Sequence, residues 1–161
     1  MSLSGRLGLF VFAVIFTFCF IGNAHSNDLG GCIHGSYLFQ EGSGTQSLWT
    51  FSKDGTVQTS SSAQGALNFS DAYGAWKQTR SWHATAIVLD FNYNGSIGNG
   101  FPPSSIARVD AVLSFSKNCK NVQGSFELRF FDPETEDPLD RNSDTGTPIS
   151  DTFTGRRIEP L

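Results

Sequence analysis

Basic residues are scarce in this chain, and they are scattered along it. The 161 residues include 11 lysines and arginines against 15 acidic residues, a net charge of −4. Nucleic acids and anionic membrane surfaces are bound through basic patches that replace counterions, so the composition argues against both as partners. Only three histidines occur, and neither a Gly-x-Ser-x-Gly elbow nor a phosphate-binding glycine loop is present. The sequence therefore indicates no catalytic nucleophile and no cofactor.

Long apolar runs are also missing, except at the start of the chain. Leu7 to Ile21 is almost unbroken in apolar character, Arg6 is the only charge before it, and Ala24-His25-Ser26 has the small-x-small pattern of a cleavage site. This order predicts a secretory signal peptide over residues 1–26. A membrane anchor is the alternative, but the run is shorter than the ~20 residues that span a bilayer. We expect a secreted or periplasmic protein whose residues 27–161 form one domain that does not insert into a membrane.

Cysteines are few, and their number agrees with export. Cys19 leaves with the signal peptide, so Cys32 and Cys119 remain as an even pair. In an oxidising compartment such a pair predicts a disulfide. Two buried thiols, or a metal or redox pair, are the alternatives, although no Cys-x-x-Cys spacing supports the latter.

Amphipathic helix patterns are absent, whereas extended segments recur between turn signals. Fifteen phenylalanines and seventeen glycines in so short a chain favour an all-β protein. Sequential hairpins predict an up-and-down, mostly antiparallel barrel, since closure removes the two open edges. We expect residues 27–33 to cover one end of the barrel and the Ser- and Gly-rich residues 60–71 to form a loop over an open end. The eight expected strands are residues 37–39, 48–51, 56–59, 73–79, 82–93, 107–116, 122–131 and 152–159.

Two dipeptides mark hairpin turns. Asp54-Gly55 lies between two segments rich in aromatic and β-branched residues, and Asn94-Gly95 follows the longest expected strand. Both dipeptides suit a two-residue turn that needs positive φ at both central positions. We therefore expect Asp54-Gly55 to form the tip of a two-residue hairpin.

The order of these features resembles the lipocalin-like, or calycin-type, small barrels. The resemblance rests on Gly35-Ser36-Tyr37, on the hairpin from Trp49 to Val57, and on Gly74-Ala75-Trp76. The chain is similar in particular to uncharacterised secreted bacterial proteins of this type. Tyr37 stands where a lipocalin signature has tryptophan, and no helix pattern accompanies the last strands. The resemblance implies an eight-stranded barrel whose interior holds side chains or one small ligand.

Aromatic residues on the expected strands are the strongest functional signal. They would either fill the barrel or line a pocket for an apolar ligand. The six rings that we take as candidate ligand-binding residues are Tyr37, Trp49, Phe51, Trp76, Phe115 and Phe126.

Four charged residues form the best polar constellation. Arg108, Asp110, Glu127 and Arg129 alternate with apolar residues on two consecutive strands, and a register that joins the apolar faces can set Asp110 across from Arg129. We expect these charges on the outer face, because unpaired charges are costly inside a barrel. Turned inward, they would instead support a cyclase or isomerase, as in allene oxide cyclase-like barrels.

A weak calcium pattern occurs before the last strand. Asp140, Asn142, Asp144 and Asp151 approach the spacing of a calcium loop, but Gly146 falls one place late and no helix flanks the segment. We expect a solvated acidic loop without a metal.

Three hypotheses about function follow from these patterns. The first is an exported barrel that binds a small apolar or amphipathic molecule in an aromatic interior. The second is a cyclase or isomerase that uses the charged residues, and the third is an interaction module with a filled core. The orientation of residues 107–116 distinguishes the first and third from the second.

Overall fold

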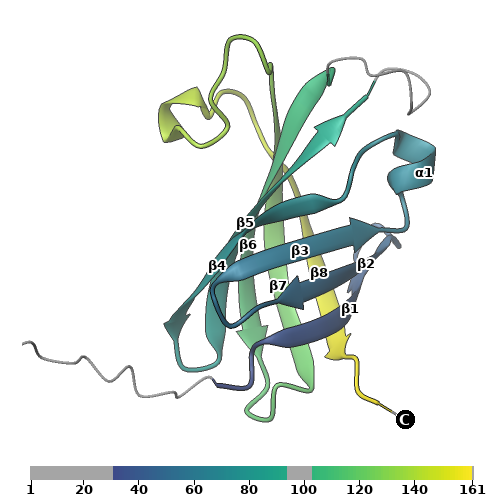
Figure 1. The fold of residues 1–161 in the computed structure, drawn as a ribbon, viewed down its shortest axis with the longest axis vertical. Coiled ribbons are helices and arrows are strands. Elements are labelled where there is room, and N and C mark those ends of the chain that lie inside the picture. The colour runs from purple at the N-terminus through teal and green to yellow at the C-terminus, as the bar shows by residue number, and fades with distance from the viewer. Residues whose placement is uncertain (1–30, 94–102, 161) are drawn as a thin grey trace, which may run out of the picture.

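Eight antiparallel strands form a closed barrel in the computed structural model, which describes residues 31–93 and 103–160 (Figure 1). Each strand pairs with the next, and β8 returns to pair with β1. The predicted all-β, eight-stranded, up-and-down barrel is therefore confirmed. The strands are β1 (Gly35–Glu41), β2 (Gln46–Phe51), β3 (Thr56–Ser61), β4 (Ala72–Arg80), β5 (His83–Asn92), β6 (Ser105–Phe115), β7 (Asn121–Phe131) and β8 (Ile149–Arg157).

Helical structure is confined to two short pieces in the described residues. The segment expected as a loop contains α1 (Gln64–Leu67), and the connection from β7 to β8 contains the 3-10 helix η1 (Arg141–Ser143). No helix in the described ranges has the length and apolar character needed to span a membrane. The predicted signal peptide over residues 1–26 and the predicted turn at Asn94-Gly95 lie outside the described residues.

Large and small side chains face each other across the barrel. β1 and β2 direct rings inward, among them Tyr37 and Phe51, whereas β5 and β6 direct small residues inward, among them Ala86 and Ala111. The alternation of buried and exposed residues along these strands is that of a sheet with one solvated face. Small residues on one wall leave the space that rings from the other wall occupy. On β6 the apolar face, with Leu113 and Phe115, points inward.

The lower end of the barrel in Figure 1 is closed by the segment before β1. Cys32 and Cys119 are joined by the predicted disulfide, with Cα atoms 5.8 Å apart. Ile33 has no exposed surface, and the Tyr37 hydroxyl donates a hydrogen bond to its carbonyl oxygen at 3.0 Å. Arg157 donates to the carbonyl oxygens of Cys32 and His34. For residues 31–33 these contacts agree with the prediction that residues 27–33 cover one end of the barrel, whereas residues 27–30 lie outside the described residues.

The Asp54-Gly55 hairpin differs from the predicted two-residue turn. Gly55 N–H donates to the Ser52 carbonyl oxygen at 3.2 Å, and Ser52 N–H donates to the Thr56 carbonyl oxygen at 2.9 Å, which leaves three residues in the loop. Only Gly55 has positive φ, at 89°. The Asp54 carboxylate accepts from both Thr56 N–H and Thr56 Oγ1, at 2.9 and 2.7 Å. This local hydrogen bonding favours a turn in which glycine alone takes the left-handed conformation.

Candidate functional site

The barrel interior is open at the end opposite the disulfide. A cavity of about 350 Å³ lies there, within the range of small-molecule sites. The three long strands β5, β6 and β7 rise past the short strands β1, β2 and β3 at this end (Figure 1). Two larger hollows, of about 640 and 610 Å³, lie against outward-facing polar residues such as Gln40 and Gln123 and are not part of the interior.

Three rings form the floor of the cavity. Phe39 stacks on Trp49 with ring centroids 5.3 Å apart, and on Phe153 with centroids 4.6 Å apart. All three are at most 5% exposed, and all three line the cavity. Further up, β6 and β7 contribute Val109 and Phe126. The wall is therefore mostly apolar, as expected of a site for a hydrophobic ligand.

The segment with α1 lies over the mouth of the cavity. Its residues Leu67 and Phe69 line the cavity, although Leu67 is 66% exposed. Asn68 ends α1 with a φ of 56°, and backbone hydrogen bonds join this segment to the end of β5: Ser70 N–H donates to Phe91, and Tyr93 N–H donates to Asn68. The expected position of this segment at an open end is thus observed, with a short helix in place of a plain loop.

Asp90 places a carboxyl group in the apolar wall. It follows Ala84, Ala86 and Val88 on the inward face of β5, and only 9% of it is exposed. Asn92 Nδ2 donates a long hydrogen bond to Asp90 Oδ1, at 3.4 Å. No salt bridge within the described ranges includes it. Burial raises the pKa of Asp90 to about 6, because the charged form loses hydration.

A second carboxyl group reaches the same cavity from β1. Ser47 Oγ donates to Glu41 Oε1 at 2.9 Å, and Trp49 Nε1 donates to Ser47 Oγ at 3.2 Å. Burial raises the pKa of Glu41, and the nearby charge of Asp151 adds to the shift while the Ser47 hydrogen bond opposes it. The chain of hydrogen bonds from an indole to a carboxyl group links the floor of the cavity to its polar side.

The six predicted ring residues divide between two halves of the interior: the open half, which contains the cavity, and the closed half, which lies toward the disulfide. Trp49 and Phe126 line the cavity. The others pack in the closed half, where Phe51 lies 5.7–6.0 Å from the rings of Tyr37, Trp76 and Phe115, centroid to centroid. Phe39, Phe153, Glu41 and Asp90 line the cavity without having been predicted. Asp90 was visible in the sequence as a charged residue that shares a face with Ala84, Ala86 and Val88.

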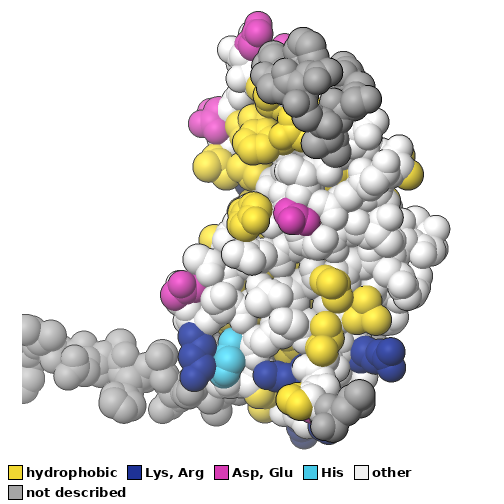
Figure 2. All heavy atoms as spheres, turned by 45° about the vertical axis from the view of Figure 1, so that its right-hand side comes forward, with side chains coloured by type: hydrophobic (Ala, Val, Ile, Leu, Met, Phe, Trp, Pro, Cys, Tyr) yellow, Lys and Arg dark blue, Asp and Glu magenta, His cyan; other side chains and the backbone are white. Residues whose placement is uncertain are grey.

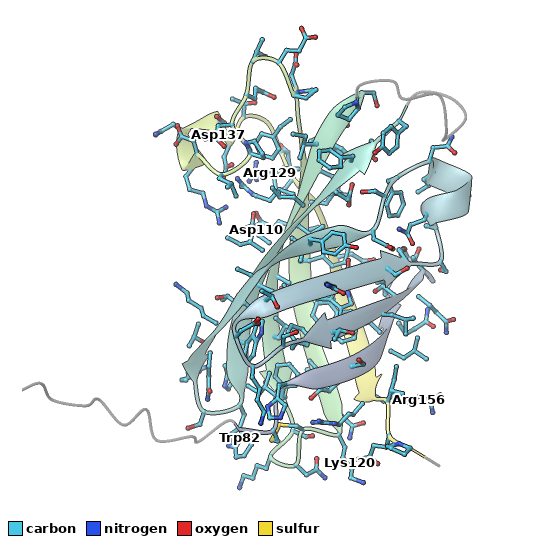
Figure 3. The ribbon with its side chains drawn as sticks, viewed as in Figure 1. Trp82, Asp110, Lys120, Arg129, Asp137 and Arg156 are labelled. Atoms are coloured by element: carbon cyan, nitrogen blue, oxygen red, sulfur yellow. A yellow bond between two sulfur atoms is a disulfide. The ribbon has the colours of Figure 1, made fainter. Side chains whose placement is uncertain are left out.

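The four predicted charged residues lie on the outer face of the barrel. Figure 3 shows two of them, Asp110 and Arg129, beneath the connection between β7 and β8. The register that could have set Asp110 across from Arg129 is not the observed one, since Asp110 is opposite Glu127 and Arg108 is opposite Arg129. A tight turn sets this register, with Ser116 N–H bonded to Asn121 and Cys119 at a φ of 51°. The two registers differ by two residues, so the hydrophobic pattern could not distinguish them.

Arg108 is buried on that outer face and has partners for its charge. It is 1% exposed, and it donates to Asp110 at 2.8 Å, to Asp144 at 2.6 Å and to the Pro138 carbonyl oxygen at 2.6 Å. Its guanidinium carbon also lies 5.0 Å from the centre of the Phe131 ring. Asp110 lies two residues further along β6, and Asp144 comes within reach because residues 132–148 fold over that strand. These contacts hold the loop to the barrel and leave the charge no role in the interior.

The four calcium candidates take different partners. Asp140 accepts from Asn142 N–H and Nδ2, both at 2.9 Å, as the cap of η1. Burial alone would raise the pKa of Asp144, but Arg108, Arg141 and Arg129 hold it below its usual value. Asp151 accepts from Ser43 N–H at 2.8 Å, at the other end of the barrel mouth. Within residues 31–93 and 103–160 no group of three or more His, Cys, Asp or Glu side chains is arranged to hold a metal.

Charges separate between the two ends of the molecule. Figure 2 shows Lys, Arg and His side chains at the lower end and Asp and Glu side chains toward the upper end. The disulfide end carries Lys117, Lys120, Arg156 and Arg157. The acidic residues of the loop between β7 and β8 are Asp132, Glu134, Glu136, Asp137, Asp140 and Asp144.

Comparison of the chain with protein-family models, with curated proteins and with solved structures found no match.

Proposed function

We propose that this protein binds one small, mostly apolar molecule in the open half of its barrel. The observation that carries the proposal is the cavity of about 350 Å³, floored by Phe39, Trp49 and Phe153. A barrel of eight strands can hold side chains or one small ligand. Here the rings fill one half of the interior and leave the other half open.

The alternative functions find less support in the geometry. The filled-core hypothesis agrees with the closed half, where the rings around Phe51 are in contact. It does not explain the cavity above them. A cyclase or isomerase that uses Arg108, Asp110, Glu127 and Arg129 would need these side chains in the interior, whereas they point to the outer face. Binding of a ligand is therefore the function that we favour.

We further propose that the protein is exported and belongs with the lipocalin-like barrels. The disulfide between Cys32 and Cys119 supports an oxidising compartment. The closed barrel with next-neighbour pairing supports the resemblance to lipocalin-like proteins. Amino-terminal sequencing of the protein released by its own host tests the export step: a start at residue 27 supports it, and retention of residues 1–26 contradicts it.

The binding proposal is tested with N-phenyl-1-naphthylamine, a neutral fluorescent probe that brightens in apolar sites. The wild-type protein should show saturable enhancement. Val109→Phe should abolish it, because Val109 lines the cavity and a larger ring there would take up the space.

Val112→Phe is the matched control for this experiment. Val112 is on the same strand but is 58% exposed on the outer face. Probe binding by this variant should equal that of the wild type. No saturable response in the wild type, or equal losses in both variants, would contradict the proposal.

A further inference from the structure

Asp90 is the feature of the cavity that an apolar ligand alone leaves unexplained. Its side chain is 9% exposed, lines the cavity and accepts a hydrogen bond from Asn92 Nδ2 at 3.4 Å. A buried carboxylate is costly unless it is paired. Arg108, the buried charge on the neighbouring strand, has two carboxylates within 2.8 Å. The residues that the structure describes offer Asp90 no such cation.

We infer that the ligand of this cavity is an organic cation, a hydrophobic amine whose ammonium group is bound by the Asp90 carboxylate. This inference rests on the proposed function, since it names the chemical class of the ligand in the same cavity. The hydrocarbon part of the amine would lie on the rings of Phe39, Trp49 and Phe153. Rings attract cations over their faces, so Trp49 also favours a positive group nearby.

Glu41 supplies a second acceptor on the other side of the cavity. Ser47 Oγ donates to its Oε1, and no hydrogen bond from the described residues reaches its Oε2. An ammonium group has three N–H donors, and the two carboxyl groups and Asn92 are the polar acceptors on β1 and β5 that line the cavity. A ligand carboxylate would instead meet two groups of its own sign.

The field of the protein acts in the same direction. Acidic residues gather toward the open end and basic residues at the disulfide end (Figure 2). A mouth lined by charges of one sign raises the local concentration of the opposite ion. Amines are therefore attracted to the entrance, and fatty acids are repelled from it.

A hydrated metal ion fits this cavity less well than an amine. Calcium takes six or more oxygen ligands, whereas the described residues bring no group of three metal-binding side chains together. The floor of three rings provides no oxygen ligand for a metal ion, but it matches the hydrocarbon part of an amine. We therefore assign the carboxyl groups to an organic cation.

The test is displacement of N-phenyl-1-naphthylamine by three molecules with one skeleton: 3-phenylpropylamine, 3-phenylpropanol and 3-phenylpropanoate at pH ~7.5, where Asp90 with a pKa of about 6 is ionised. The amine should displace the probe at a concentration at least about tenfold lower than the acid. Asp90→Asn should still bind the probe, but its preference for the amine should fall to less than about threefold.

Glu134→Gln is the matched control, because it removes one exposed acidic charge from the loop after β7. It should keep the preference of the wild type. An equal loss in this variant would assign the preference to the general field and would overturn the role of Asp90.

The pH dependence gives a second readout on Asp90. Among the residues that the structure describes, Asp90 and Glu41 are the titratable groups that line the cavity, whereas β3, β4, β6, β7 and β8 direct neutral side chains into it. Displacement by the amine should weaken as pH falls through about 6, where Asp90 becomes protonated. Asp90→Asn should lose most of this dependence. The neutral residues that these five strands place on the cavity are Thr59, Ser61, Ala72, Ala107, Val109, Phe126, Leu128, Phe130 and Phe153.

The outcomes separate this inference from the proposed function. Probe binding with equal displacement by amine and acid would overturn the inference and leave the proposed function intact. Displacement by Ca²⁺ in place of the amine would do the same. Absence of probe binding and of amine binding in the wild type would overturn both.

Discussion

The two halves of the barrel interior are built from the same eight strands, yet one is filled and the other is open. In the closed half Phe115 of β6 reaches the rings of Tyr37 and Phe51, 5.4 and 6.0 Å away between centroids. In the open half the same strand contributes Ala107 and Val109. The number of strands sets the width of a barrel. The size of a few inward side chains then decides whether that width holds a core or a cavity.

Two buried charges on paired strands repeat this contrast. Arg108 lies opposite Leu89 and faces outward, where Asp110, Asp144 and the covering loop surround it. Asp90 lies opposite Ala107 and faces inward, where its hydrogen bond from Asn92 is long. A charge with complete pairing holds the fold together, whereas a charge without a cation fits a site that is completed by a ligand.

The largest expected effect is a difference between the two halves of the interior: a substitution in the closed half should mainly lower stability, and one in the open half should mainly weaken ligand binding. Phe51→Ala should lower the free energy of unfolding by about 4 kcal/mol, because the ring is fully buried among other rings. Its affinity for N-phenyl-1-naphthylamine should change by less than about threefold. Phe126→Ala, which alters the cavity wall, should cost only about 1.5 kcal/mol but weaken probe binding at least about tenfold. Urea unfolding and probe titration measure the free energy of unfolding and the probe affinity. Similar changes of both quantities in the two variants would contradict the division into a packed half and a binding half.

The paired charge outside the barrel should matter for stability alone. Arg108→Met should lower the free energy of unfolding by about 2 kcal/mol, because it leaves Asp110 and Asp144 without their buried partner. Arg141→Met, which removes an arginine that is 57% exposed from the same two carboxylates, should cost less than about 0.5 kcal/mol. Urea unfolding of both variants tests the ranking. Equal losses in the free energy of unfolding would show that the burial of Arg108 does not increase its contribution to stability.

The hairpin between β2 and β3 should depend on the backbone conformation that Gly55 adopts. Gly55→Val should lower the free energy of unfolding by about 1 kcal/mol or more, because a β-branched residue resists the φ of 89° at this position. Lys53→Val, in the same loop but without positive φ, should change stability by less than half as much. An unchanged denaturation midpoint for Gly55→Val would contradict the assigned turn.

The smallest expected effect is the pH dependence that Asp90 contributes without ligand. Its folded pKa of about 6 lies above the unfolded value, so its protonated form favours folding, and this contribution is present at low pH and lost as pH rises through about 6. Because the cavity is open to solvent at its mouth, we expect screening to limit the effect to less than about 1 kcal/mol. Stability of wild type minus that of Asp90→Asn should therefore fall between pH ~4 and ~7. A flat difference would show that Asp90 is not desolvated.

Sequence patterns predicted the barrel because its strands alternate clearly and nearly all end in turn signals. They also predicted the disulfide, from an even pair of cysteines in a chain expected to be exported. They did not predict the register of β6 and β7, since a shift of two residues keeps the same faces inward. They could not divide the rings between the halves, because that division depends on which residues of distant strands meet across the barrel. The contact between Arg108 and Asp144 joins residues 36 positions apart, and no local pattern encodes it.

The position of the ligand site in the open half of the barrel is tested by the three indole N–H signals of the protein in a ¹H–¹⁵N NMR titration. Trp49 lies on the floor of the cavity, Trp76 donates to the Ser52 carbonyl oxygen at 2.8 Å in the closed half, and Trp82 lies in the turn before β5. Addition of N-phenyl-1-naphthylamine should shift the Trp49 signal in a saturable way and leave those of Trp76 and Trp82 in place. Shifts of Trp76 or Trp82 without a shift of Trp49 would contradict a ligand site in the open half of the barrel.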